Sequence, residues 1–296
     1  MHASPPVISV VVPTKGRLSS LERCLGALRD ADFGRERFEV VVANDRGGER
    51  VESVVASFAD DLRVATTTPP RSGPSAARNA GAAAARGAYV AFTDDDCEPE
   101  ARWLSALERA LVENAGAAVG GRVTNGAPES LGAVATQAVV DALHAQFNRD
   151  PGSPRFFASS NVAFPAEAFR SLGGFDEESR YAEDRELCER WIRAGQRFVS
   201  APKAVVIHMR RLGLREFTAQ HYGYGRGARA FGRAQSPTER RADRWGVLRE
   251  LAGEAVCRHD HHGRLPVAGY LALSQLATAA GFARETVGGR GRPRRS

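Results

Sequence analysis

The chain has 296 residues, a formal net charge of +6 and a pI near 9.5. Hydrophobic residues make up 43% and charged residues 26%, a balance that excludes a mainly disordered chain and allows one large domain or one domain with an appendage. The basic balance suits anionic partners such as nucleotide phosphates or acidic lipid surfaces.

The first hundred residues alternate between short apolar runs and helical patterns. Strands are predicted at residues 7–12, 38–43, 62–65 and 88–93. Helices are predicted at residues 18–28, at residues 51–58 and in an alanine-rich stretch that ends near residue 85. Apolar strands that alternate with helices predict an α/β fold with a parallel sheet covered on both faces.

The rest of the chain is less regular. Helices are predicted after residue 99, at residues 131–145 and at residues 183–194, and strands at residues 117–123, 197–200 and 204–207. Beyond residue 211 the composition shifts, and residues 210–250 have ten arginines against four acids. This basic segment is either a helical appendage with a solvated arginine face or a surface for an anionic acceptor or acidic lipid.

Cysteine usage and hydropathy bear on the location of the protein. The four cysteines are far apart and form no CxxC pair, which argues against a disulfide framework or a zinc ribbon. The first residues do not resemble a signal peptide. No run of about 18 uncharged apolar residues occurs, so we predict no membrane-spanning helix, and residues 267–282 are predicted to form a buried or surface-lying helix. We predict a cytoplasmic protein, with a position at the inner face of the membrane as an alternative.

Polar side chains follow the predicted N-terminal strands, and the acid triplet Asp94, Asp95 and Asp96 is the sharpest of these features. In such a sheet, ligands bind in the crevice beyond the carboxyl ends of the strands. Because residues i and i+2 of an extended segment point the same way, Asp94 and Asp96 are predicted to share one Mg²⁺ or Mn²⁺ ion that also binds a diphosphate. The alternative is a solvated acidic loop in which Asp96 caps a helix.

Five segments carry recognisable motifs. They are VISVVVPTKGR at residues 7–17, VVANDRGG within residues 40–48, GPSAARNAGAAAARG at residues 73–87, FTDDD at residues 92–96 and GGFDEESRYAEDRELCER at residues 173–190. In this order they resemble the motifs of the family 2 glycosyltransferases, which have the GT-A fold. The resemblance covers about residues 7–210 and is weakest at residues 125–160 and 211–290.

The resemblance implies a fold, an activity and a domain organisation. Residues 1–210 are expected to form the GT-A catalytic domain, with a mixed, mostly parallel sheet flanked by helices. Residues 211–289 are expected to form a helical C-terminal appendage, and residues 290–296 a disordered basic tail. The implied reaction transfers a sugar, with inversion, from a nucleotide-diphosphate donor to a hydroxyl of a glycan, a lipid-linked or a small-molecule acceptor. UDP is the family's default nucleotide, and cell-wall or polysaccharide biosynthesis is the expected context.

The same resemblance implies roles for individual residues on the donor side. Asp45 matches the acid that binds the nucleobase, and Asn44 stands where an aspartate is more usual. The other expected nucleotide or donor contacts are Pro13, Lys15, Arg71, Arg78, Asp94 and Asp95. The expected ligands of the divalent cation are Asp96, Asp94 and His208.

On the acceptor side, Asp184 matches the catalytic base that takes the proton from the acceptor hydroxyl. Asn161 and Glu183 are candidates for contacts with the acceptor or the sugar. The alternative for Glu183 and Asp184 is that they only complement the dipole at the start of a helix. The alternative for Asn161 is a loop amide with all its hydrogen bonds made within the chain.

Other function classes fit the sequence less well. A nucleotidyltransferase typically has a glycine-rich, basic phosphate loop after the first strand, and PTKGRLSS is a poor match. A non-catalytic nucleotide-sugar binding protein would be favoured had the acidic motifs decayed, and they are intact. Nucleic acid is not expected as a partner because no known DNA- or RNA-binding motif accompanies the positive charge. We therefore predict a metal-dependent inverting glycosyltransferase.

Overall fold

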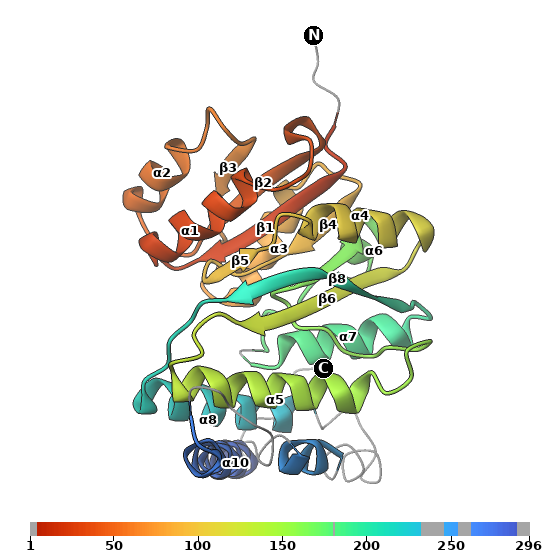
Figure 1. Ribbon diagram of the computed structural model, residues 1–296. Helices are drawn as coiled ribbons and strands as arrows, with labels where there is room; N and C mark the ends of the chain where they lie inside the picture. The colour runs from red at the N-terminus through yellow and green to blue at the C-terminus, as the bar shows by residue number, and fades with distance from the viewer. Residues whose placement is uncertain (1–4, 180, 232–245, 254–261, 289–296) are drawn as a thin grey trace. The chain divides into compact units, whose positions relative to one another are not determined.

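The structure is a computed structural model, and it describes residues 5–179, 181–231, 246–253 and 262–288 (Figure 1). The chain forms two compact units. The first comprises residues 1–126, 148–177 and 184–210, and the second residues 127–147, 178–183 and 211–296. Residues 127–147 thus group with the C-terminal helices. The predicted domain boundary at residue 210 stays a prediction, and the predicted tail at residues 290–296 lies outside the described residues.

The first unit contains an eight-stranded sheet with the order β3-β2-β1-β4-β7-β6-β8-β5. The strands are β1 (Ile8–Thr14), β2 (Phe38–Asn44), β3 (Val64–Thr67), β4 (Tyr89–Phe92), β5 (Cys97–Pro99), β6 (Ala118–Asn125), β7 (Val162–Pro165) and β8 (Phe198–His208). Strands β1 to β4 pair in parallel, β6 pairs in parallel with β8, and the β4–β7, β6–β7 and β5–β8 pairs are antiparallel. The predicted α/β class with a mixed sheet is confirmed.

Helices cover both faces of this sheet because successive side chains of a strand point to opposite faces. The helices of the first unit are α1 (Leu18–Arg29), η1 (Arg35–Arg37), α2 (Glu49–Ala56), α3 (Pro74–Ala84), α4 (Trp103–Glu113), α6 (Ala166–Ser171) and α7 (Glu183–Arg193). Val10 and Val12 of β1 are buried in one core cluster with the apolar sides of α1, α2 and α4. Val11 points to the other face, where a Cβ atom at Gly81 of α3 would lie 2.3 Å from its Cγ1 atom. Glycine therefore allows α3 to approach β1 closely.

Aromatic side chains from several elements form a second packed layer. Phe92 of β4 packs against Phe175 with the ring centroids 5.2 Å apart, and Phe164 of β7 packs edge-on against Trp191 of α7 at 5.0 Å. Phe169 of α6 contacts both Phe92 and Phe164. Burial of such rings is among the largest apolar contributions to a core. The cluster fixes α7 and the turn at Phe175 against the strand that leads into the acid triplet.

The structure differs from the predicted elements in the second half of the sheet. The strands predicted at residues 197–200 and 204–207 form one strand, β8, whose pairing with β6 continues past a register shift between Gly120 and Arg122. The short elements β5, β7 and α6 were not predicted. Each has three to six residues, too few to show a period of their own.

A buried acid on β2, Glu39, forms a network of hydrogen bonds with Ser9 and Arg86. Glu39 is 3% exposed and accepts hydrogen bonds from Ser9 Oγ at 2.6 Å, from the Arg86 backbone N–H at 2.7 Å and from Arg86 Nη2 at 2.6 Å. Burial alone raises the pKa of Glu39, but these hydrogen bonds and the charge of Arg86 outweigh it, so the pKa lies below its ordinary value of 4.5. The ionised carboxylate is therefore the form that the fold stabilises.

Glu39→Gln is expected to lower the free energy of unfolding by about 1–3 kcal/mol at neutral pH, because buried partners of the carboxylate lose an ionic acceptor. A lowered pKa in the folded state gives stability that is present above the ordinary pKa and is lost as the pH falls through the lowered value. The difference between wild type and variant should therefore shrink below pH 4.5. Urea denaturation across the acid range measures this. Glu49→Gln, an exposed acid on α2, is the control, and an equal effect there would contradict the assignment.

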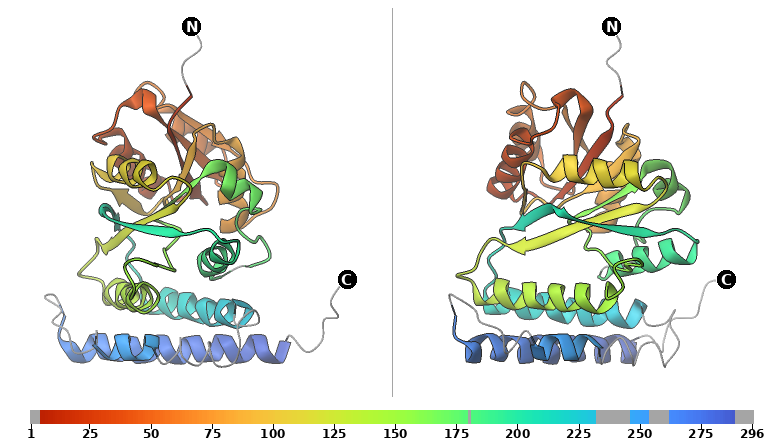
Figure 2. Two further views of the ribbon diagram at one scale, coloured as in Figure 1. Left: turned by 90° about the vertical axis from the view of Figure 1, so that its right-hand side faces the viewer. Right: turned by 45° about the vertical axis from the view of Figure 1, so that its right-hand side comes forward.

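The second unit is helical. Its helices include α5 (Leu131–Phe147), α8 (Leu214–Phe231) and α10 (Arg264–Gly288), which Figure 2 shows from two further sides. Residues such as Ala138, Phe217, Val267 and Leu271 bury a common apolar cluster. His221 of α8 is 1% exposed within this unit, lies 3.3 Å from Thr136 Oγ1, and has a pKa lowered by burial to about 4. The neutral imidazole is thus part of the packing.

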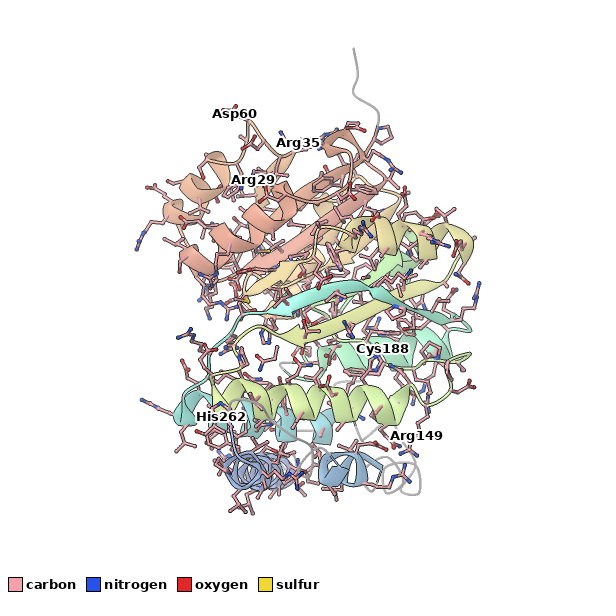
Figure 3. All side chains as sticks on the ribbon, in the orientation of Figure 1. Arg29, Arg35, Asp60, Arg149, Cys188 and His262 are labelled. Atoms are coloured by element: carbon pink, nitrogen blue, oxygen red, sulfur yellow. The ribbon has the colours of Figure 1, made fainter. Side chains whose placement is uncertain are left out.

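Two expectations from the composition can be compared with the structure. Cys24, Cys97 and Cys188 are buried free thiols, and Cys188 is labelled in Figure 3. The segment from Arg264 to Thr286 is, by length and composition alone, long and apolar enough to cross a membrane, although the sequence predicted no such helix. Its best 18-residue window has a mean hydropathy of 1.2 and 28% of that window is buried. Ser274, Gln275 and Thr278 interrupt the apolar run without lowering its mean hydropathy below this level.

Candidate functional site

The candidate site lies where parallel strands of the first unit end side by side. Thr14 at the end of β1 is in register with Asn44 at the end of β2, and the Asp45 backbone N–H donates to the Thr14 carbonyl oxygen at 2.8 Å. Strand β4, on the other side of β1, leads through Thr93 into the acid triplet. The predicted gathering of polar groups at one edge therefore follows from the strand order.

Asp45 is buried at this edge and one of its oxygens has no partner. Its Oδ2 atom accepts hydrogen bonds at 3.0 Å from Ser72 Oγ and from the Gly73 backbone N–H, which lie just before α3. Its Oδ1 atom is buried and makes no hydrogen bond to any described residue. A buried acceptor without a donor is costly unless a ligand supplies the donor. Asn44 instead closes its own turn by accepting from the Gly47 backbone N–H at 2.8 Å.

The acid triplet forms a turn, which corrects the extended geometry predicted for it. The Cys97 backbone N–H donates to the Asp94 carbonyl oxygen at 3.1 Å, and β5 starts at Cys97. No helix begins there for Asp96 to cap. The turn sends the three carboxylates to different partners, so Asp94 and Asp96 do not share an environment by strand alternation.

Asp94 faces the helix arginine that was predicted to contact the donor. Its Oδ1 atom accepts a hydrogen bond from Arg78 Nη2 at 2.6 Å, and the Arg78 side chain is 5% exposed whereas that of Asp94 is 27% exposed. The Arg78 guanidinium also lies over the Phe175 ring, 5.5 Å from its centroid. A buried cation beside a partly exposed carboxylate offers both signs of charge to a ligand at this place.

Asp95 is engaged within the chain, which corrects its assignment as a donor contact. It is 0% exposed, its Oδ2 atom accepts from Thr14 Oγ1 at 2.6 Å, and its Oδ1 atom accepts from Arg17 Nε at 3.0 Å. Burial raises the pKa of Asp95 above its ordinary value, although the hydrogen bonds and charge of Arg17 oppose the rise. With both oxygens used and no exposed surface, Asp95 anchors the turn to β1.

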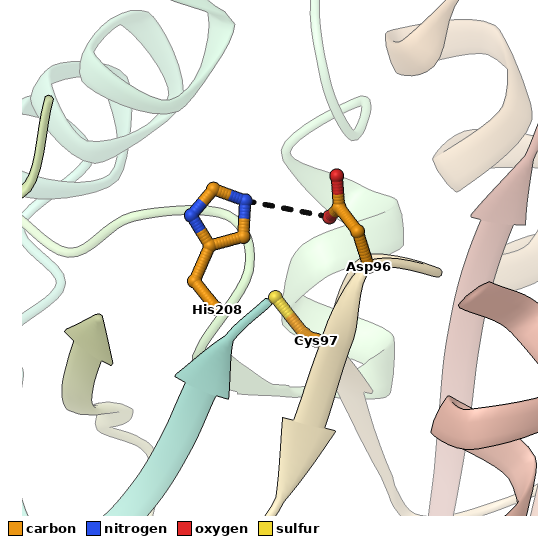
Figure 4. A group of neighbouring side chains, drawn as sticks. All are labelled: Asp96, Cys97 and His208. Atoms are coloured by element: carbon orange, nitrogen blue, oxygen red, sulfur yellow. Dashed lines mark ion pairs between the residues drawn. The ribbon is translucent and has the colours of Figure 1, made fainter. Parts of the chain in front are cut away.

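Asp96 and His208 form the second ionisable pair of the site (Figure 4). Antiparallel pairing places Cys97 of β5 opposite His208 of β8, and the Asp96 Oδ1 atom lies 3.5 Å from His208 Nε2. Arg17 Nη1 lies 2.9 Å from the other oxygen, Oδ2. Burial raises the pKa of Asp96, but the hydrogen bond and charge of His208 and the charge of Arg17 outweigh it and lower the pKa to about 2. Asp96 is therefore a carboxylate at neutral pH.

The donor set around Asp96 fits a divalent cation. Ligand atoms of Asp96, Cys97 and His208 lie within 4.8 Å of one another. A carboxylate with an imidazole suits a hard or borderline ion such as Mn²⁺. Burial raises the pKa of the Cys97 thiol well above its ordinary value, and thiolate is a softer ligand than Mn²⁺ or Mg²⁺ prefers. The fit therefore rests on Asp96 and His208.

The side chain of Asn161 makes its hydrogen bonds within the sheet and to α4, which corrects its assignment as an acceptor or sugar contact. It is 1% exposed, and its Oδ1 atom accepts from Trp103 Nε1 at 2.8 Å. Its Nδ2 group donates to the carbonyl oxygens of Arg122 and Ala204, both at 2.9 Å. The satisfied amide joins β6, β8 and α4, so we leave it out of the proposed site.

Glu183 and Asp184 are the first two residues of α7. Asp184 is partly buried, and its Oδ1 atom accepts from the Arg185 backbone N–H at 2.8 Å. Ala182, directly before the helix, has a φ of +59°, a left-handed conformation that costs energy for alanine. Acids at a helix N-terminus are electrostatically favourable.

Polar contacts tie α7 to the α3 motif. Arg190 of α7 donates to the carbonyl oxygens of Leu172 and Gly174, both at 2.7 Å. Asn79 of α3 accepts from the Phe175 backbone N–H at 2.8 Å and donates to the Phe175 carbonyl oxygen at 2.9 Å. The segments that resemble ARNxG, GGFDE and ED are thus one connected framework, which the sequence order alone did not show.

The remaining predicted donor contacts lie near the surface. Pro13 is half-buried in β1, and Lys15 is exposed just beyond it. The Arg71 side chain is 70% exposed and lies 3.8 Å from Glu177. Their roles in binding stay predictions.

The sequence analysis missed Arg17 as a site residue. Its guanidinium bonds to Asp95 and pairs with Asp96, and 46% of the side chain remains exposed. Thr14 adds a second bond to Asp95. Thr14 and Arg17 could have been indicated only by assuming that the first strand pairs in parallel with the strand before the acid triplet.

The sequence matches one family profile, described as Glycosyl transferase family 2, over residues 9–173. Among curated relatives, the pre-mycofactocin glycosyltransferase of Mycobacterium tuberculosis is 31% identical over 236 aligned residues, and the match covers 76% of this chain and 48% of that protein. The probable glycosyltransferase YdaM of Bacillus subtilis is 28% identical over 214 residues, 68% of this chain and 50% of that protein. The chain spans about half the length of these relatives.

Solved structures share the fold. The mannosyltransferase PcManGT from Pyrobaculum calidifontis, in complex with GDP-Man and Mn²⁺, superposes with a TM-score of 0.67 at 17% identity, over 96% of this chain and 88% of that one. TarS residues 1–349 from S. aureus, in complex with UDP-GlcNAc, gives 0.60 at 16% identity, over 97% and 93%. The family match covers more than half of the chain, with three of the five motif segments in full and residues 9–17 of the first. The chain therefore belongs to glycosyl transferase family 2 and has the GT-A fold.

Proposed function

We propose that the protein is a metal-dependent glycosyltransferase that moves a sugar, with inversion, from a nucleotide-diphosphate donor to a hydroxyl acceptor. The observation that carries the proposal is the buried, unpartnered Asp45 oxygen at the same sheet edge as the acidic turn. A carboxylate oxygen accepts the N–H of a base such as uracil or guanine. With the base at Asp45, the diphosphate and a bound cation would lie further along the same sheet edge, toward the acidic turn.

The chain's own residues supply the donor side. Asp45 binds and orients the base, and the buried Arg78 guanidinium lies 2.6 Å from Asp94, where a diphosphate can compete for its hydrogen bonds. Asp96 and His208 would hold a divalent cation, which would stabilise negative charge on the departing diphosphate. Arg17 holds Asp96 from the opposite side at 2.9 Å and so fixes its orientation.

On the acceptor side, Asp184 takes the proton of the attacking hydroxyl at a carboxylate oxygen. Inversion requires such a base on the side of the sugar opposite the leaving nucleotide. Glu183, next to it at the start of α7, is proposed to contact the acceptor. The acceptor itself is a glycan, a lipid-linked or a small-molecule substrate, and a cytoplasmic location is part of the same proposal.

Calorimetric titration with UDP, GDP, TDP and CDP, in Mn²⁺ and in EDTA, tests the proposal. The expected result is selective binding of one diphosphate that requires the metal. The matching nucleotide-sugars are then tested for release of the diphosphate in the presence of acceptors. Folded protein that binds no nucleotide would contradict the proposed donor site, and binding without transfer to any acceptor would favour a non-catalytic nucleotide-sugar binding protein.

Asp45→Asn is expected to weaken binding of the preferred diphosphate about 10- to 100-fold if its base presents an N–H donor, because a charged acceptor is replaced by a neutral amide. Asparagine keeps an oxygen for the Gly73 backbone N–H, so the loop before α3 should stay in place. Titration of the panel measures the change. CDP, whose ring N3 is an acceptor, is the internal control and should lose less affinity than UDP. An equal loss for every base would point to a damaged loop instead.

A further inference from the structure

Helix α10 of the second unit has two apolar sides, and the described residues of the unit cover only one of them. From Arg264 to Arg284 the sequence has no charged residue between the two arginines. One side buries Val267, Leu271, Ser274 and Ala277 within the unit. A helix that is apolar all round is normally buried on every side, so the uncovered side calls for a partner.

The uncovered side follows the helical period. Exposed residues recur every three or four positions along one side, at Leu265, Gly269, Ala272, Leu276, Ala279 and Ala283, and Pro266, Ala280 and Phe282 are exposed as well. We call the six residues along that one side the α10 stripe. Leu265 is 86% exposed and Leu276 is 69% exposed. Single exposed leucines are ordinary, but a continuous stripe without a polar side chain marks an interaction surface.

Packing within the unit fixes which side of α10 is free. A Cβ atom at Gly225 of α8 would lie 1.9 Å from the Thr278 carbonyl oxygen, and one at Gly281 would lie 2.0 Å from the Tyr222 carbonyl oxygen. The Arg226 and Glu285 side chains form an ion pair at 3.0 Å. These close backbone contacts hold α8 on one side of α10, so rotation cannot bury the stripe.

An apolar hollow adjoins the same helix pair. It has a volume of about 660 Å³ and is lined mainly by apolar atoms, from residues that include Leu214, Tyr222, Ala277 and Ala280, with Arg215 among them. Leu214 is 56% exposed. The hollow extends the uncovered apolar surface from α10 onto α8, and Arg215 is among its lining residues.

The charges around the stripe select the partner. Arg264 and Arg284 stand at its two ends, Arg215 lines the hollow, and the sequence after α10 adds four arginines between residues 290 and 295. An apolar strip bounded by arginines is complementary to a bilayer surface, where acyl chains take the apolar side chains and anionic headgroups take the guanidinium groups. A second protein surface would need acids at matching positions.

The same contacts argue that α10 lies on a bilayer and does not cross it. Its buried side is closely packed on α8, and α8 carries Arg215, Glu216 and Arg226. Moving this helix pair into hydrocarbon would bury those charges at a cost of several kcal/mol. Separating α10 from α8 would instead break the Arg226–Glu285 pair and expose the packed side.

We propose that the α10 stripe, with Arg264 and Arg284 at its ends, docks the second unit onto the surface of an anionic lipid bilayer. The proposal does not depend on the activity of the first unit. Docking buries the leucines of the stripe at the level of the headgroups and pairs the arginines with anionic lipid.

Co-sedimentation of the full chain with vesicles of phosphatidylcholine, with and without phosphatidylglycerol, tests this. Wild type is expected to bind the anionic vesicles and to be released by raised salt. Leu276→Glu should weaken binding about tenfold or more, because one buried leucine is lost and an acid faces anionic lipid. Leu265→Gln should weaken it less. Val112→Glu, on α4 of the first unit and 63% exposed, is the matched control and should bind as wild type does.

Three results would overturn the proposal. The first is no binding to anionic vesicles, or equal binding by wild type and Leu276→Glu. The second is binding that resists salt and alkaline carbonate, which would indicate a spanning helix. The third is a lipid-free dimer that Leu276→Glu dissociates, in sedimentation equilibrium, without any vesicle binding; the stripe would then pair with a second copy. Because Leu265 and Leu276 are exposed, neither variant removes packing, and circular dichroism checks that both fold.

Discussion

Asp184→Asn is expected to lower the kcat of sugar transfer by about 10²- to 10⁴-fold. The side chain keeps its size and can still accept from the Arg185 backbone N–H, as Asp184 does at 2.8 Å. What it loses is a carboxylate to take the proton of the acceptor hydroxyl. The residues that are proposed to bind the nucleotide lie on elements other than α7, so the affinity for the diphosphate should be unchanged. Initial rates with the donor identified by titration, and titration of the diphosphate itself, separate the two.

Glu189→Gln is the matched control for this variant. Glu189 is on the same helix, where it pairs with Arg155 at 3.2 Å and Arg193 at 3.0 Å at the unit's surface. Its loss should leave transfer close to wild type. Full activity of Asp184→Asn would remove the base assignment. A loss of nucleotide affinity equal to the loss of rate would show that Asp184 supports the donor site and not proton transfer.

Asp96→Ala is expected to lower transfer by at least about 100-fold and to remove the dependence of nucleotide binding on Mn²⁺. The pKa of about 2 makes Asp96 a carboxylate throughout the neutral range, ready for a cation without loss of a proton. Its removal leaves His208 as the nearest partner for the ion and leaves Arg17 without one of its two acids. Titration of Mn²⁺ in the presence of the preferred diphosphate measures the effect.

Cys97→Ser tests whether the Cys97 thiol binds the cation or only lies near its other ligands. The thiol lies within the same group of atoms as Asp96 and His208, but sulfur is a softer ligand than Mn²⁺ prefers. The Mn²⁺ affinity of this variant should therefore match that of wild type, whereas a large loss would make the thiol a ligand. Unchanged Mn²⁺-dependent affinity in Asp96→Ala would refute the metal role of Asp96. In either variant, thermal unfolding checks that the β5–β8 pair is intact.

Local patterns predicted the first half of the fold well because strands β1 and β2 are buried almost along their whole length and the helices have one apolar side. The run at Ile8–Thr14 and the leucine spacing of Leu18–Arg29 are examples. The second half was harder. Strands β5 and β7 have three and four residues and exist because neighbouring strands pair with them. Strand β8 was predicted as two strands, and its pairing with β6 does break between Ser200 and Val205, at the register shift between Gly120 and Arg122.

The site shows the same division. Motif order identified Asp45, Asp94, Asp96, His208 and Asp184 as candidates, and none of these is excluded by its position. Asp95 and Asn161 were assigned to ligands on the same basis and proved to be buried and fully bonded within the chain. A motif records which residue types occur, whereas burial and the direction of a side chain depend on neighbours that are distant in sequence.

The sequence by itself determined the α/β class, the family and the set of residues that carry the proposed chemistry, because short-range periodicity and motif spacing are written along the chain. Only the tertiary structure decided which of those residues meet. His208 lies beside Asp96, 112 positions earlier, because β5 and β8 pair antiparallel, and Arg17 joins Asp95 and Asp96 because β1 lies next to β4. It also decided which side of α10 the described residues leave uncovered, since both sides lack charge in the sequence and packing against α8 distinguishes them.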